Sequence, residues 1–273
     1  MHKKMRITPS LVFLLIIFPV IFFPLYVMFI GSFKPNFAMY QLPPDLAPWN
    51  LIFTNYETVF GKLNFFQPLW NSFFVAIMTT FFTLLVATTA GYAFAKKFFY
   101  GKRWLFAVLI ATMMLPRQVL MIPTFIVVKQ LNLVDNLWGV ILTSISAPFG
   151  VFLMKQFMQT IPTELLEAAK IDGCSEGRSF VSIVLRLSLP AIGALAIFTI
   201  IATWNDFLWQ FVLIGKKALR TMPIAISSLA QEQIAKIGSQ LAAAALATLP
   251  VLLIFIACQN FFIKGITMGA VKG

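Results

Sequence analysis

A short charged stretch lies between two long apolar regions of this chain and reads Glu167-Ala168-Ala169-Lys170-Ile171-Asp172-Gly173. Alanine is the strongest helix former, and acidic side chains are favoured near the positive, N-terminal end of a helix. Glycine is common just past the end of a helix. The stretch therefore predicts a short helix from Thr163 to Asp172, ended by Gly173. Its small-residue face could enter a groove in a soluble partner.

The composition places the rest of the chain in a membrane. Hydrophobic residues make up 60% of the 273 residues and charged residues only 11%, whereas soluble domains carry about 25% charged residues. An all-helical integral membrane protein follows. His2 is the only histidine, and Cys174 and Cys258 share no motif. The sequence therefore predicts no metal site and no catalytic constellation.

Six apolar segments are long enough to cross a bilayer, which takes about 20 residues of helix. They lie near 11–31, 71–94, 105–127, 137–155, 189–213 and 241–263. Small residues suited to close helix packing occur at Gly91, Ser144 and Ser146. We expect one transmembrane domain, residues 1–273, with a polar cytoplasmic loop at 156–188.

Basic residues predict the orientation. With both termini in the cytoplasm, the inside segments carry 13 of the 21 lysines and arginines, and the outside loops carry 7. This bias agrees with the positive-inside rule. The basic residues are scattered over separate loops and form no patch suited to nucleic acid.

Several motifs together resemble the permeases of ABC importers. The charged stretch and the residues after it, Phe180, Ile183, Leu185 and Pro190, are similar to the signature loop of that family. Further similarity lies in Asn71-Ser72-Phe73, Leu115-Pro116, Ile122-Pro123, Trp204-Asn205-Asp206-Phe207-Leu208 and the ending from Gln259 to Gly273. That ending resembles carbohydrate importers, in particular the smaller permease partner in systems for maltose, lactose, arabinose-type sugars and glycerol 3-phosphate.

The resemblance implies the type I ABC importer permease fold in the inner membrane and a set of partners. These are a second permease subunit, two ATP-binding subunits and an extracytoplasmic sugar-binding protein. ATP and Mg would be bound by the partners, and this chain has no phosphate-binding loop of its own. The residues implied to couple ATPase closure to transport are Glu167, Ala168, Ala169, Asp172 and Gly173.

Two positions depart from the family pattern. Arg186 stands where a proline usually follows the leucine of the signature loop, and Gln210 stands where a proline commonly follows the Trp-Asn-Asp-Phe-Leu-Trp run. We expect the backbone to bend at Leu185-Arg186 as it does in the family. The geometry after Gln210 stays open.

Charges within the membrane are candidates for function. Arg117 lies in the third span and Asp206 near the outer end of the fifth; together with Trp204 and Asn205 they are candidates for the substrate pathway. A structural ion pair, or side chains reaching outward to water, is the alternative for the two charges. A stand-alone secondary transporter or a membrane-embedded enzyme would need coupling charges near the midplane or convergent catalytic groups. Few such groups occur.

Overall fold

A computed structural model describes residues 9–62, 64–145, 147–230 and 236–270, and every regular element in these ranges is helical. This confirms the all-helical prediction. The chain divides into two compact units, one of residues 1–66 and 225–250, and one of 67–224 and 251–273. The prediction for Ser146 and for both termini falls partly or wholly outside the described residues.

The first unit contains α1 (Pro9–Ser32), η1 (Asn36–Met39), α2 (Thr54–Lys62) and the first half of α14 (Ile237–Ala270). The fully buried Lys34 Nζ lies 2.8 Å from Asp45 Oδ2 and donates to Trp49 O. Asn55 Nδ2 donates to the carbonyls of Ser32 and Lys34. These bonds fix the chain after α1, where backbone groups would otherwise be buried without partners.

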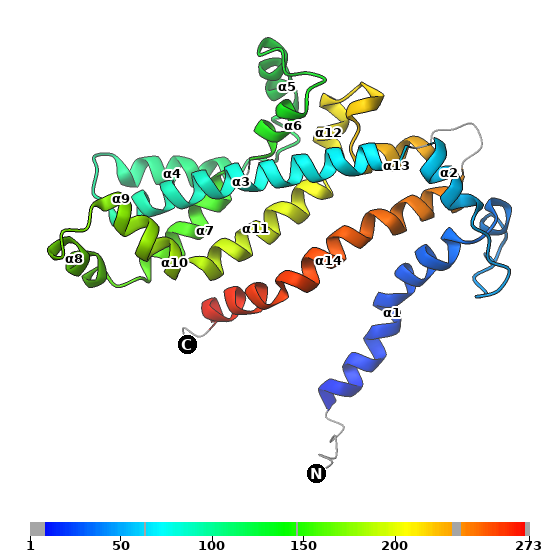
Figure 1. Ribbon diagram of the computed structural model, residues 1–273, viewed down its shortest axis with the longest axis horizontal. Coiled ribbons are helices and arrows are strands. Elements are labelled where there is room, and N and C mark those ends of the chain that lie inside the picture. The colour runs from blue at the N-terminus through cyan, green and yellow to red at the C-terminus, as the bar shows by residue number, and fades with distance from the viewer. Residues whose placement is uncertain (1–8, 63, 146, 231–235, 271–273) are drawn as a thin grey trace. The chain divides into compact units, whose positions relative to one another are not determined.

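The second unit carries the candidate sites and begins with the long helix α3 (Phe66–Lys96) (Figure 1). Its other helices up to the fifth predicted span are α4 (Lys102–Met113), α5 (Met121–Gln130), α6 (Leu137–Ser144), α7 (Ala147–Gln159), α8 (Glu164–Ile171), α9 (Glu176–Ser179), η2 (Phe180–Val184), α10 (Leu185–Leu187), α11 (Leu189–Trp204) and α12 (Leu208–Leu213). The connection after α12 contains η3 (Lys217–Leu219) and the start of α13 (Met222–Ala230).

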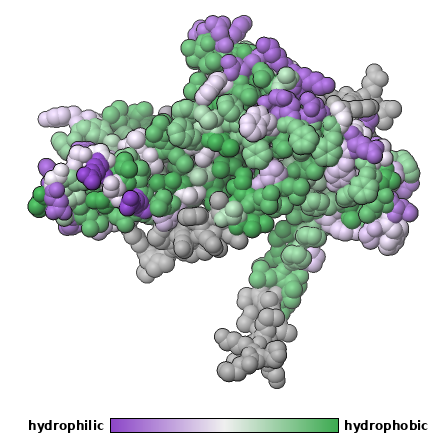
Figure 2. All heavy atoms as spheres, viewed as in Figure 1, coloured by the Kyte–Doolittle hydropathy of each residue, from purple (hydrophilic) through white to green (hydrophobic). Residues whose placement is uncertain are grey.

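Helices α4 and α11 pack on α7, and α12 packs on α5 and α6. Small residues bring α3 and α7 together: a Cβ on Gly91 would lie 2.7 Å from Met154 Cβ, and one on Gly150 would lie 2.9 Å from Ala87 Cβ. The close packing predicted for Gly91 is therefore confirmed. Apolar side chains cover much of the visible surface, whereas hydrophilic ones gather near α8 and α9 and near α5 and α12 (Figure 2).

Three helices, α1, α3 and α14, are long and apolar enough to cross a membrane. Two further spans arise if bent pairs are counted: α6 with α7, bent by 43°, and the 176–187 segment with α11, bent by 74°. The structure is consistent with the predicted multi-pass protein and gives up to five such spans among the described residues.

Three of the six predicted spans are wrong as continuous helices, and the fourth is the bent pair of α6 and α7 described above. The third is interrupted at 114–120, between α4 and α5, where Pro116 disfavours helical backbone at the residue before it. The fifth stops at Trp204 and restarts at Leu208. In that interruption Asn205 Nδ2 donates to Ile201 O and Asp206 Oδ1 accepts from Trp209 N, so polar side chains compete for backbone groups.

The bend expected at Leu185-Arg186 is also corrected. Leu185 has helical dihedrals, φ −63° and ψ −40°, and the wide π-turn of η2 continues directly into α10. The break comes at Ser188, after which Pro190 sits in the first turn of α11. Without a proline at position 186, nothing forces the helix to end earlier.

Candidate functional site

Helix α8 forms as the charged stretch predicts, from Glu164 to Ile171, with Thr163 and Asp172 flanking it. Gly173 has φ +76°, the left-handed conformation that glycine adopts without strain. Cys174 N donates to Ala169 O at 2.9 Å and Gly173 N to Lys170 O at 3.1 Å. This pair of bonds is a Schellman motif, which satisfies the carbonyls at the end of the helix.

The exposed face of α8 contains most of the residues implied to couple. Glu167, Ala168, Asp172 and Gly173 are exposed, whereas Ala169 is buried against the chain itself. Ile171, which the sequence analysis did not single out, is 86% exposed. The face therefore combines a carboxylate, small residues and one large apolar side chain, a combination suited to a protein contact.

Lysines at the end of α3 bond the chain segments before and after α8. Before α8, Lys96 Nζ donates to Ile161 O and Thr163 Oγ1. After α8, Lys97 Nζ lies 2.8 Å from Glu176 Oε1. The hydrogen bond that Lys97 Nζ donates to the Glu176 carboxylate is the largest cause of the raised pKa of Lys97. The segments before and after α8 are therefore both anchored to the same end of α3.

An aromatic contact adds to these ties. The rings of Tyr92 and Phe180 lie 4.9 Å apart, and Tyr92, Met158, Ile161 and Val184 share one buried apolar cluster. Movement of the loop would therefore require movement of α3 and α7 or the loss of buried contacts.

The second candidate site lies where the interrupted third and fifth spans meet. Arg117 Nη2 is 3.9 Å from Asp206 Oδ2, and the guanidinium lies 5.7 Å from the ring centre of Trp209. The side chain of Asp206 is 11% exposed and that of Arg117 55%. The structure thus brings together two of the four candidate pathway residues.

Both charges line an open cavity. Arg117 and Asp206 border a space of about 240 Å³ together with Ser144, Thr199 and Thr203. A second space of about 350 Å³ shares Arg117, Ser144 and Phe149 with the first. Ser144 Oγ is buried and has no hydrogen-bond partner among the described residues. A cavity with an ion pair, hydroxyl groups and aromatic rings can bind a polar molecule by hydrogen bonds.

Trp204 and Asn205 lie elsewhere. Trp204 is buried, with its ring 5.0 Å from that of Phe73, and Asn205 bonds to the backbone of its own helix. Neither borders the two cavities. Their part in a pathway stays a prediction that the cavity geometry does not support.

Sequence reasoning missed Ser144 as a cavity residue and Gln210 as a buried hydrogen-bonding group. Gln210 Nε2 donates to Thr203 O at 2.9 Å, and its Oε1 accepts from Thr221 Oγ1. The departure from proline at this position was the available signal. The bonding partners could not be inferred because Thr221 lies beyond the helix, across a loop.

The fold itself is that of ABC importer permeases. A crystal structure of a bacterial ABC transporter involved in the import of the acidic polysaccharide alginate contains a chain that superimposes with a TM-score of 0.81. The match covers 93% of this chain and 95% of that chain, at 22% sequence identity. The protein is therefore a multi-pass helical membrane protein of this fold.

The chain belongs to the family of binding-protein-dependent transport system inner membrane components, whose model matches residues 87–268. It is 35% identical to the arabinooligosaccharides transport system permease protein AraQ of Bacillus subtilis (strain 168), covering 92% of this chain and 90% of that protein. It is 32% identical to the lactose transport system permease protein LacG of Rhizobium radiobacter, covering 81% of each.

Proposed function

We propose that this chain is a permease subunit of an ATP-driven importer for a sugar or sugar derivative. The similarity to permeases named for arabinooligosaccharides and lactose supports the substrate class. The chain itself acts as a non-catalytic subunit. It pairs with a second permease, docks two ATP-binding subunits that hold ATP and Mg, and receives substrate from an extracytoplasmic binding protein.

The observation that carries the proposal is the exposed α8, held at both sides by the end of one long helix. Glu167 and Ile171 face outward, while Lys96 and Lys97 tie the segments before and after α8 to α3. A partner that grips α8 can therefore displace α3 and α7 with it. Partner closure would bias the permease between inward-facing and outward-facing states, which is a population shift driven by binding.

The cavity beside Arg117 and Asp206 is the proposed part of the pathway that meets substrate. Sugars present several hydroxyl groups, and the ion pair, Ser144 and Thr199 offer both donors and acceptors at its wall. Because Arg117 and Asp206 lie 3.9 Å apart, each can keep the other as its counter-ion while its remaining hydrogen-bonding groups bind hydroxyl groups of a neutral substrate.

The α8 assignment is tested with Glu167→Lys in the full importer. Charge reversal at the contact should lower ATPase retention and sugar uptake while leaving insertion in the membrane normal. Lys129→Glu, which reverses an exposed charge on α5, is the matched control. Normal uptake and normal ATPase retention in Glu167→Lys would overturn the docking assignment.

The orientation is tested by labelling single cysteines on a cysteine-free background. The proposal puts both termini and the 156–188 loop in the cytoplasm. Residue 170 should react with an impermeant reagent only after the cells are opened, and residue 217 should react in intact cells. Labelling of residue 170 from outside intact cells would show that the topology is the reverse of the proposed one.

A stand-alone secondary transporter remains the second candidate, because Arg117 and Asp206 could serve as coupling charges. The two candidates differ in their energy source. Uptake that persists in vesicles without the ATP-binding subunits, driven by an ion gradient, would favour the second. Strict dependence on ATP and on those subunits would favour the first.

A further inference from the structure

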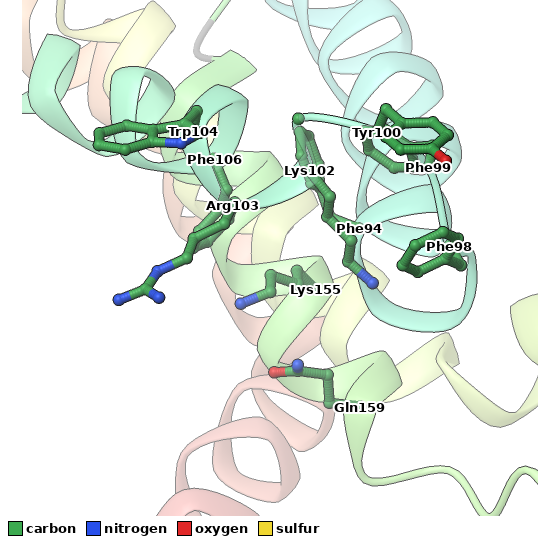
Figure 3. A pocket seen from close by; sticks show the side chains of 11 residues that line it. Phe94, Phe98, Phe99, Tyr100, Lys102, Arg103, Trp104, Phe106, Lys155 and Gln159 are labelled. Carbon is green, nitrogen blue, oxygen red and sulfur yellow. The ribbon is translucent and has the colours of Figure 1, made fainter.

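A cavity of about 480 Å³ lies between the connection from α3 to α4 and the end of α7, and none of the site residues described above lines it. Figure 3 shows Phe98, Phe99 and Tyr100 on the connection, Arg103 and Trp104 at the start of α4, and Lys155 and Gln159 on α7. The eleven residues that line it are Phe94, Phe98, Phe99, Tyr100, Gly101, Lys102, Arg103, Trp104, Phe106, Lys155 and Gln159. Three of them are cationic and none is acidic.

The three cations are not neutralised by the described part of the chain. Lys102, Arg103 and Lys155 form no ion pair there, and Glu176, the carboxylate after α8, is held by Lys97. Lys102 Nζ donates to Lys97 O at 2.7 Å, which leaves two of its three donors free. Lys155 Nζ lies 3.8 Å from the ring centre of Phe106, a cation–π contact that positions it at the cavity wall.

The aromatic residues around these cations are unusually exposed. Phe98, Tyr100 and Trp104 are 90%, 94% and 78% exposed, and no residue of α4 is buried. Aromatic side chains of this kind gather at the level of lipid headgroups in membrane proteins. The end of α3, a membrane-spanning helix, brings the cavity to that level.

We infer that this cavity binds the headgroup of an anionic phospholipid, with its acyl chains lying along the apolar surface of α4. The phosphate would accept hydrogen bonds from Lys102, Arg103 and Lys155, which relieves the repulsion among three like charges that share one cavity. Basic pockets at the cytoplasmic side of membrane helices bind such headgroups. The leaflet follows from the proposed orientation; the lipid chemistry follows from the lining alone.

The test titrates the full-length chain in detergent with dioleoylphosphatidylglycerol or dioleoylphosphatidylcholine and counts bound lipid by native mass spectrometry. Phosphatidylglycerol should bind more tightly. The variant Lys102→Gln with Lys155→Gln should bind it about 25-fold more weakly, at about fivefold for each charge removed near a membrane surface. The control, Lys216→Gln with Lys217→Gln, removes the same charge from an exposed loop and should bind as wild type.

Equal binding of the two lipids, or equal loss in the control variant, overturns the inference. Displacement of phosphatidylglycerol by millimolar inorganic phosphate assigns the cavity to a free anion instead. If the variant Lys102→Gln with Lys155→Gln loses a copurified ATP-binding subunit but binds lipid as wild type does, the cavity is a contact for that subunit instead. If the double glutamine variant does not fold, Arg103→Gln should still weaken binding about fivefold, and Lys102→Arg with Lys155→Arg should preserve it.

Discussion

The α8 loop and the interruption of the fifth span satisfy their polar groups in different ways. At α8 the carbonyls at the helix end are bonded within six residues, by Gly173 N and Cys174 N. At the interruption, Thr203 O is bonded by the side chain of Gln210, which is itself bonded by Thr221 across the following connection. The first arrangement is local, so α8 can keep these bonds when it moves together with α3 and α7. The second holds distant segments together and fixes their positions.

The connection after α12 strengthens that contrast. Asn71 Nδ2 donates to Ala218 O and Arg220 O at 2.9 Å, and Ser72 Oγ accepts from Met222 N at 2.8 Å. Both side chains lie near the start of α3, whereas Lys96 and Lys97 lie at its other end. One helix therefore carries a fixed network at one end and the tied loop at the other.

The largest expected effect concerns α10, the short helix that continues η2 and precedes α11. Arg186→Pro should lower the free energy of unfolding by about 3 kcal/mol, because proline inside a helix removes a backbone hydrogen bond and clashes with the preceding turn. Arg186→Ala should change little, since the side chain is exposed. The readout is thermal stability of the purified protein. Equal stability of the two variants would mean that the backbone bends at Leu185-Arg186 after all.

Gln210→Leu should destabilise by about 2 kcal/mol, because Thr221 Oγ1 loses its buried partner and Thr203 O keeps only the 3.3 Å bond from Asp206 N. Gln130→Leu, at an exposed end of α5, is the control and should be nearly neutral. A double-mutant cycle with Thr221→Val sharpens the test, since residues in one network show non-additive effects. Strict additivity would show that the two side chains act separately.

Gly173→Ala should cost about 1 kcal/mol, because a residue with a Cβ is strained at positive φ. The matched control is Gly177→Ala in α9, which has no positive φ and has open space around it. That substitution should be neutral or slightly stabilising. Chemical denaturation of both variants measures the difference, and a loss of the same size at Gly177 would contradict the turn geometry.

The smallest expected effect is at Lys97. The pair with Glu176 is largely exposed, so Lys97→Gln should cost only about 0.5 kcal/mol at neutral pH. Because the folded-state pKa of Lys97 is raised, its contribution is complete below the unfolded value of about 10.4 and is lost as the pH rises through the folded value. Melting temperatures of wild type and variant should differ at neutral pH and converge at strongly alkaline pH. Convergence near neutral pH would contradict the ion pair.

Local chemistry made α8 predictable, whereas the interruptions depended on distant partners. Two alanines, acidic residues at the start and Gly173 at the stop specify a helix without tertiary help. Hydropathy made 105–127 and 189–213 resemble ordinary spans because Arg117, Asn205 and Asp206 are few among many apolar neighbours. The meeting of Arg117 with Asp206 joins residues far apart in the chain, and no periodicity reports such a distance.

The contact between α3 and α7 has a mechanical consequence. At Gly91 and Gly150 the two helices approach so closely that even a methyl group would collide with the neighbouring helix. Met154 Cβ fills the space beside Gly91 and Ala87 Cβ fills the space beside Gly150, so sliding of one helix along the other would press these atoms against neighbouring residues. We therefore expect α3 and α7 to move together over this length. A displacement of one end of α3 should therefore displace α7 by the same amount.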